Sequence, residues 1–222
     1  MTLPFTRDQF LAVFAAYNEA VAPFQLVLLV AGIAAVVLIL YPVRRSDRIV
    51  GALLAGLWLW MAVQYHWRFF RTINPAATLF AVAFLIEAVL LAEFAVRRQR
   101  LRFRARTSWS GGGSGWALAL VIYALAVYPA IGWALGHRYP AAPTFGLPCP
   151  TTIFTLGLLA WTEERPPLVI MVIPWAWALV GTVAALQLGM REDLGLPVAL
   201  VVSLLRWNAQ RPRTAASSPA TA

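Results

Sequence analysis

Three side chains in this sequence could bind a soft or borderline metal ion: Cys149, His66 and His137. Cys149 is the only cysteine and lies between two prolines in Gly-Leu-Pro-Cys-Pro-Thr-Thr-Ile-Phe-Thr-Leu-Gly, residues 146–157. Thiolate and imidazole suit copper or zinc. No Cys-x-x-Cys or His-x-x-x-His spacing is present, so a shared site requires these distant residues to converge. We therefore predict no cofactor, with copper, zinc or haem as the alternative.

Other polar residues could bind a solute without a metal. They are amide, phenol and hydroxyl side chains near the ends of apolar segments: Asn18, Tyr65, Asn74, Thr151 and Thr152. The favoured interpretation of Cys149 is a small buried residue in a proline-stiffened turn. Histidines near helix ends are more often hydrogen-bonding residues at the membrane interface than metal ligands.

Two glutamates in one apolar segment predict different roles. Glu93 precedes Arg97 by four residues, which predicts an ion pair on one helical face. Glu87 lies about 18 Å along the same helix from Pro75, close to mid-membrane, where an ionised carboxylate is costly. Glu87 therefore suggests a proton or ion pathway, although a neutral glutamate that joins helices explains it equally well. Its candidate partners, by residue type alone, are Gln64, Thr155, Thr182 and Gln187.

The composition decides which solvent surrounds these residues. Hydrophobic residues make up 61% of the 222-residue chain and charged residues only 12%, too few to cover a soluble globule. The sequence therefore predicts an all-α polytopic membrane protein. Signatures of hydrolases, kinases and metalloproteases are missing, so no catalytic residue is predicted and enzymatic activity has the least support.

Residues 1–22 are predicted to form a short amphipathic helix. Thr6 and Gln9 fit a capping box, with Phe5 and Phe10 at the positions of a hydrophobic staple. The apolar stripe that follows suits a helix in the membrane interface or a helix packed against its neighbours.

The transmembrane domain is predicted to cover residues 23–207. Its seven apolar segments are 23–41, 49–67, 75–96, 116–136, 149–161, 168–190 and 194–207. The fifth and seventh are short and both begin at a Gly-Leu-Pro sequence, so it stays open whether they span the bilayer fully. Proline inside the fourth and sixth segments predicts kinks. Residues 208–222 have the composition of a disordered cytoplasmic tail.

All 18 basic residues are arginine, and their placement predicts an orientation. Six lie within residues 97–106, ahead of a Gly/Ser-rich linker that ends at residue 115. With the N-terminus outside and the C-terminus inside, 13 arginines lie on the cytoplasmic side and five outside. The basic loop is therefore a topogenic signal that contacts anionic lipids, and no nucleic-acid binding is predicted.

Several motifs resemble those of a family of uncharacterised bacterial integral membrane proteins, a domain of unknown function. They are Tyr17-Asn18, Tyr65-His66, Phe69-Phe70, Asn74-Pro75-Ala76-Ala77 and the Gly146–Gly157 sequence. The resemblance covers nearly the whole chain apart from the arginine loop, linker and tail. It implies a bacterial plasma (inner) membrane location and no assigned activity.

Three functions remain open from the sequence. The first is a permease-like transporter of a small solute or ion, coupled to protons, with a site at the outer face where proline-broken segments meet. The second is a metal- or redox-handling protein or sensor that uses Cys149 with His66 and His137. The third is an accessory subunit that binds a second copy or a partner membrane protein.

Overall fold

The computed structural model describes residues 3–105 and 113–210, with side chains described from residue 115 onward in the second range. The described residues form helices and turns, with two isolated β-bridges. Residues 106–112 of the basic loop and linker lie outside the described residues, as does the part of the predicted tail from residue 211 onward. The elements are α1 (Arg7–Leu40), α2 (Ser46–Trp60), η1 (Met61–Phe69), η2 (Phe70–Thr72), α3 (Ala77–Leu91), η3 (Ala92–Arg97), α4 (Gly113–Ile122), η5 (Tyr123–Val127), α5 (Tyr128–Ala134), α6 (Pro148–Ala160), α7 (Leu168–Leu188), η6 (Arg191–Leu194) and α8 (Gly195–Ala209).

Five helical stretches in the described part of the chain are long and apolar enough to cross a membrane. They are 7–40, 46–72, 77–97, 115–134 and 168–188. Large apolar side chains such as Leu26, Leu79 and Leu186 are mostly exposed, which suits a surface in contact with lipid tails. The all-helical fold is confirmed for the described residues, and the five long apolar stretches are consistent with the predicted membrane protein. The predicted seven crossings stay a prediction, because α6 and α8 have only 13 and 15 residues. The predicted orientation stays a prediction as well.

The first helix starts where the sequence predicted and then runs on without a break. The Thr6 side chain accepts the backbone N–H of Gln9, and the Gln9 side chain accepts that of Thr6, which completes the capping box. The rings of Phe5 and Phe10 stack with centroids 5.7 Å apart. Residues 7–22 are therefore the first part of α1, which continues through Pro23 past the boundary predicted at residue 22.

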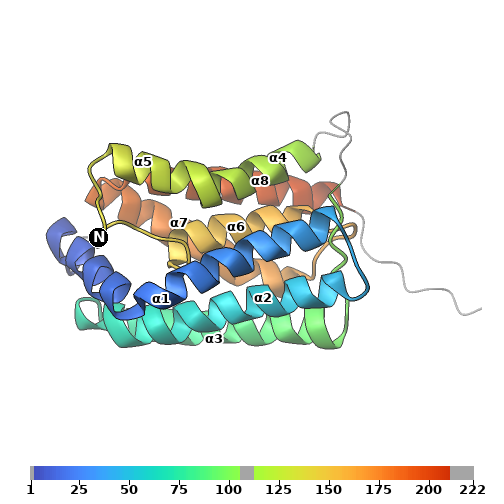
Figure 1. Ribbon diagram of the computed structural model, residues 1–222, viewed down its shortest axis with the longest axis horizontal. Helices are drawn as coiled ribbons and strands as arrows, with labels where there is room; N and C mark the ends of the chain where they lie inside the picture. Colours follow the sequence, from blue (N-terminus) through green and yellow to red (C-terminus); the bar gives the residue numbers. More distant parts are fainter. Residues whose placement is uncertain (1–2, 106–112, 211–222) are drawn as a thin grey trace, which may run out of the picture.

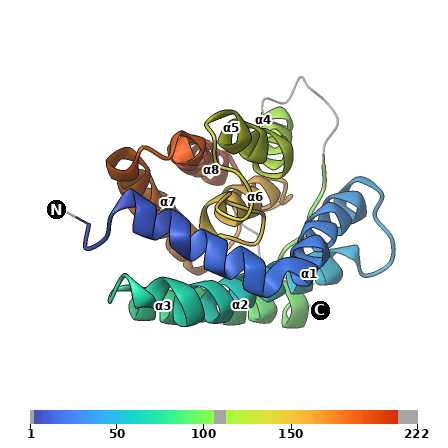
Figure 2. The same ribbon diagram turned by 60° about the vertical axis from the view of Figure 1, so that its left-hand side comes forward.

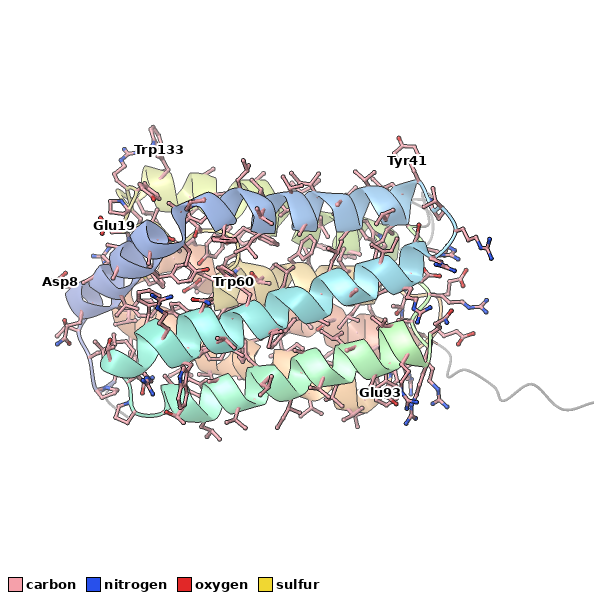
Figure 3. The ribbon with its side chains drawn as sticks, turned by 60° about the horizontal axis from the view of Figure 1, so that its bottom comes forward. Asp8, Glu19, Tyr41, Trp60, Glu93 and Trp133 are labelled. Atoms are coloured by element: carbon pink, nitrogen blue, oxygen red, sulfur yellow. The ribbon has the colours of Figure 1, made fainter. Side chains whose placement is uncertain are left out.

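A bend in α1 turns its N-terminal part across one end of the bundle (Figures 1 and 3). Pro23 has no N–H to donate to the carbonyl of Glu19, and Figure 3 shows Glu19 at this bend. The bend lets the apolar stripe, including Phe14 and Tyr17, pack against Tyr65 and Phe70. Of the two interpretations of this stripe, packing against neighbouring helices is the observed one.

The short helix α6 is the centre of the fold. Twelve of its 13 residues are buried, and Figure 2 shows the other helices arranged around it. α6 carries most of the Gly146–Gly157 sequence, so this sequence supplies the core. At Gly157 an added Cβ would lie 3.2 Å from the carbonyl oxygen of Ala117, so glycine is what lets α4 approach α6 closely.

Successive segments run between two ends of the bundle (Figure 1). At one end the N-terminal part of α1 meets the loop before α6, because Asn18 donates to the carbonyls of Pro140 and Ala142. At the other end, Arg104 pairs with Asp47 at 2.9 Å. Figure 3 shows Asp8 and Trp133 at the first end, which we call the N-terminal end, and Tyr41 and Glu93 at the second, the arginine end.

The predicted pair at the arginine end is confirmed. Glu93 accepts hydrogen bonds from both Arg97 and Arg98, the first of which lies four residues further along the same helical stretch. Pro129 lies in the first turn of α5, directly after the π-helical η5, so the predicted irregularity is spread over the preceding turn. Pro174 lies within α7, which continues through it.

Candidate functional site

A cavity of about 400 Å³ lies at the N-terminal end of the bundle. Its walls come from the residues before and within α1, the α2–α3 connection with the first turn of α3, α5 and the loop after it, the start of α6, and α7 with η6. Most lining residues are apolar or aromatic, and Phe10, Phe80 and Trp177 are examples. Exposed residues such as Val183 also line it, so the cavity reaches the surface. A mostly apolar cavity of this size with a few polar groups is the usual form of a small-molecule site.

The polar groups of the cavity converge on Asp193, in η6. The hydroxyl of Tyr128 donates to Asp193 Oδ1 at 2.5 Å, and the thiol of Cys149 hydrogen-bonds to the same carboxyl group. All three residues line the cavity. α6 starts with Pro148 in its first turn, where a missing N–H costs nothing, and this start brings Cys149 to the cavity wall.

Burial raises the pKa of Asp193 to about 7, because a charged carboxylate loses its hydration inside the protein. The negative charge of Glu192 acts in the same direction. Hydrogen bonds from Tyr128 and Cys149 stabilise the charged form and limit the shift. Asp193 therefore changes its charge near neutral pH, within reach of any molecule in the cavity.

His137 is taken up by a separate chain of polar contacts. Its Nδ1 lies 2.6 Å from Glu192 Oε1, and its Nε2 lies 2.9 Å from the guanidinium of Arg7. A guanidinium can only donate, so Nε2 accepts from Arg7 and Nδ1 is the nitrogen that faces Glu192. The lone pair that a metal ion needs is thus occupied by Arg7. The contact joins α1, the α5–α6 loop and η6.

His66 lies directly behind the aromatic wall of the cavity. Its ring is fully buried and packs edge-on against Phe80 and Trp177, with centroids 5.7 and 5.0 Å apart. Tyr65, its neighbour in sequence, lines the cavity itself. Within the described part of the chain neither nitrogen of His66 has a hydrogen-bond partner. The structure therefore keeps this imidazole apart from Cys149 by one layer of rings.

Glu87 and Thr152 lie deeper in the bundle. Both are fully buried, and the Glu87 oxygens and the Thr152 hydroxyl have no hydrogen-bond partner among the described residues. Two of the partners suggested by residue type are engaged elsewhere: Thr155 donates to the carbonyl of Thr151, and Thr182 donates to that of Ala178. The joining role for Glu87 therefore has no hydrogen bond to support it in the described chain.

Three further predicted residues shape the backbone around the cavity. Asn18 is fully buried, and its side-chain oxygen accepts from Gln25 and from Thr144. Asn74 lines the cavity and its side chain accepts the N–H of Ala76, which fixes the turn into α3. The Thr151 hydroxyl accepts the N–H of Gly146, which has φ +98. Each of these side chains therefore makes at least one hydrogen bond that shapes the local backbone.

The predicted metal ligands are not assembled. Across residues 3–105 and 113–210, no three His, Cys, Asp or Glu side chains are grouped so that they could hold a metal ion. The reason is packing: Cys149 faces Asp193, His137 faces Glu192 and Arg7, and His66 is enclosed by rings. A shared site of Cys149, His66 and His137 is thus missing from the described fold.

The sequence interpretation missed Asp193, Tyr128 and Trp177. Asp193 follows the sixth apolar segment in a short polar turn, and nothing in its local sequence pattern marks it as buried. One signal was available: the Gly-Leu-Pro sequence at the start of α6 recurs at the start of α8, two residues after Asp193. The repeat marks two proline-started helices whose first turns meet at this end of the bundle.

Comparison with known proteins gives one match. Residues 7–217 match a family of unknown function, DUF6064. The comparisons with curated proteins and with solved structures found no match. The site must therefore be interpreted from its own geometry.

Proposed function

This chain belongs to the DUF6064 family of unknown function, and we propose that it is a permease-like membrane protein. Its ligand is a small, mostly apolar solute that binds in the cavity at the N-terminal end. One observation carries the proposal: an apolar cavity of about 400 Å³ whose polar groups converge on one buried carboxyl group. Such a site buries an apolar body and orients it through one polar group.

Movement of the solute, coupled to protons, is the second part of the proposal. It is supported by two helices that begin at the cavity with a proline in the first turns, α6 and α8, because interrupted helices line the sites of many transporters. It is also supported by the unpartnered Glu87 and Thr152, since an intramembrane carboxyl group is a natural proton carrier. We place the protein in the bacterial inner membrane with seven crossings and the N-terminal end outside.

The metal- or redox-handling and sensor alternative has less support, because the three ligand residues have different neighbours. The accessory-subunit alternative, in which a second copy or a partner membrane protein binds, predicts that a bulky side chain placed in the cavity has no effect on the binding of a small probe. The probe-binding experiment that follows therefore separates this alternative from solute binding.

The test uses N-phenyl-1-naphthylamine, a neutral apolar probe that fluoresces in apolar surroundings, with the purified protein in detergent. We expect saturable binding, reduced at least tenfold by Ala184→Trp, because Ala184 lines the cavity and is partly buried. Ala176→Trp is the matched control, since Ala176 is an exposed residue on the same helix and does not line the cavity. Equal binding by the parent and Ala184→Trp would exclude the cavity as the solute site.

Uptake into reconstituted vesicles tests movement. A probe that binds in the cavity should accumulate faster in vesicles that contain the parent protein than in vesicles with Ala184→Trp. Binding without a difference in uptake would retain the site and remove the transport part of the proposal.

A further inference from the structure

The wall of the cavity is unusually rich in aromatic rings. They come from α1, η1, η2, α3, α5 and α7, and Phe10, Tyr65, Phe80 and Trp177 are examples. The faces of such rings carry partial negative charge and attract cations, most strongly when water is excluded. The ring of Trp177 also packs edge-on against Phe80 at 5.2 Å, which fixes their relative orientation.

The charges at the cavity are of one sign. Asp193 is the only carboxylic acid among its described lining residues, and none of these residues is arginine, lysine or histidine. The guanidinium of Arg7 contacts His137 Nε2, and His137 Nδ1 lies 2.6 Å from Glu192 Oε1, so these polar groups contact one another and Glu192. Within the described part of the chain no basic side chain forms an ion pair with Asp193, although neutral Tyr128 and Cys149 donate hydrogen bonds to it.

We propose that the cavity selects organic cations: apolar molecules with one delocalised or amine-type positive charge, held by the aromatic wall and paired with the carboxylate of Asp193. This inference rests on the proposed function and names its substrate class. An anion of the same shape is repelled by Asp193, and a neutral molecule gains the apolar contacts without the charge pairing.

The site also links cation binding to a proton. A cation favours the ionised form of Asp193, so at pH below about 7 its binding breaks the O–H bond of the carboxyl group and releases the proton to water. When the cation leaves, the carboxyl group regains a proton. The groups that face Asp193 from the packed elements are Glu192 on η6, Tyr128 on α5, Cys149 on α6, Tyr65 on η1 and Tyr123 on η5. Glu192 Oε1 lies 2.6 Å from His137 Nδ1, and Arg7 contacts the other nitrogen of that ring, whereas Asp193 is the carboxyl group that lines the cavity.

Three probes of similar shape test the inference: tetraphenylphosphonium (cation), tetraphenylborate (anion) and triphenylphosphine oxide (neutral). We expect the purified parent protein to bind the cation at least tenfold more tightly than the anion at pH 8. Cation affinity should fall about tenfold at pH 6, where a group with a pKa of about 7 is ionised in roughly one molecule in ten. The neutral probe should show no such change.

Asp193→Asn should lower cation affinity at pH 8 at least tenfold and remove its pH dependence, with the neutral probe unaffected. Asp8→Asn is the matched control, because Asp8 is an exposed carboxylate at the same end of the bundle and should bind like the parent. If Asp193→Asn does not fold, Trp177→Leu replaces it in the test. Because this variant loses an aromatic face that attracts cations, its affinity for the cationic probe should fall more than its affinity for the neutral probe.

The outcomes separate the two proposals. Equal cation affinity in the parent and Asp193→Asn would overturn the cation inference. Binding of the neutral probe in the cavity without preference for the cation would also overturn it and leave the solute site standing. Failure of all three probes and of the apolar fluorescent probe would remove the solute site itself.

Discussion

Asp193 shows how a single residue acquires a property that its neighbours in sequence do not announce. An aspartate in a polar turn is ordinarily ionised at pH 7. Here the carboxyl group is almost fully buried, at 3% exposure, and a second acidic residue precedes it. Burial and this neighbour together raise its pKa to about 7. A buried acid of this kind links the stability of the protein to pH.

The first prediction concerns that link. A raised pKa means that the folded protein holds the proton more tightly than the unfolded chain does. This stabilisation is complete below about pH 4 and is lost as the pH rises through about 7, and it is worth at most about 4 kcal/mol. The thermal unfolding midpoint of the parent in detergent should therefore decrease as the pH is raised from 5 to 8. Asp193→Asn should flatten this part of the curve and Asp8→Asn should leave it as in the parent. An unchanged slope in Asp193→Asn would contradict the assignment.

The second prediction concerns Glu87, whose buried oxygens have no hydrogen-bond partner in the described chain. If Glu87 carries protons, Glu87→Gln should lower proton flux at least tenfold in vesicles loaded with a pH-sensitive dye, because an amide cannot exchange the proton. Glutamine is neutral and of similar size, so the variant should keep the parent's thermal stability. Glu93→Gln, on the same helical stretch but at the arginine end, is the control and should keep its flux. Parent-like flux in Glu87→Gln would rule out Glu87 as the coupling group.

At the scale of elements, the helices approach one another through small residues. Between α2 and η3, an added Cβ at Gly51 would lie 2.3 Å from the Cβ of Ala95, a distance that the two backbones cannot accept without moving apart. Helices in a bilayer gain little from the hydrophobic effect, because lipid tails are as apolar as their side chains. Close packing at such contacts therefore contributes much of the stability of the bundle.

Two glycines on α2 test this statement. Gly51→Ala should lower the free energy of unfolding by about 1–3 kcal/mol, as expected for an overpacked contact. Gly56→Ala is the matched control, because nothing lies within 4 Å of its added Cβ, and alanine in place of a helical glycine should be neutral or stabilising by up to about 1 kcal/mol. Thermal unfolding of both variants in the same detergent measures the difference. Equal midpoints would show that this contact does not limit the packing.

At the scale of the whole molecule, the arginine-rich connections and the cavity lie at opposite ends of the bundle. The arginine end contains the basic residues around the α1–α2 and α3–α4 connections, whereas the cavity lies at the N-terminal end (Figure 3). Arginine-rich loops are retained on the cytoplasmic side, so the cavity is expected to face outward.

The orientation can be measured with single cysteines in a Cys149→Ala background. Asp8→Cys should react with a membrane-impermeant maleimide in intact cells, and Arg100→Cys should react only after permeabilisation, since both positions are exposed at opposite ends. The Cys149→Ala background alone is the control and should not react. The reverse labelling pattern would show the opposite orientation, with the cavity facing the cytoplasm.

The sequence by itself determined the features that depend on composition and on residues close together along the chain. The membrane class follows from the apolar content, the start of α1 from Thr6 and Gln9, and the pairing of Glu93 from Arg97 four residues later. The short length of α6 was also predictable, because prolines and a polar turn bound its apolar run. Such signals are local, since a helix brings residues three and four apart together whatever surrounds it.

Only the tertiary structure decided which distant groups meet. Cys149, expected to share a ligand shell with two histidines, instead meets Asp193, which lies in the turn before α8. His137 meets Glu192, 55 residues away, and Arg7, 130 residues away. These contacts depend on the rotation of each helix about its axis and on the bend of α1, which the packing of side chains around α6 sets. An apolar sequence that is nearly uniform around each helix carries little information about that rotation, so the site could not be read from the chain alone.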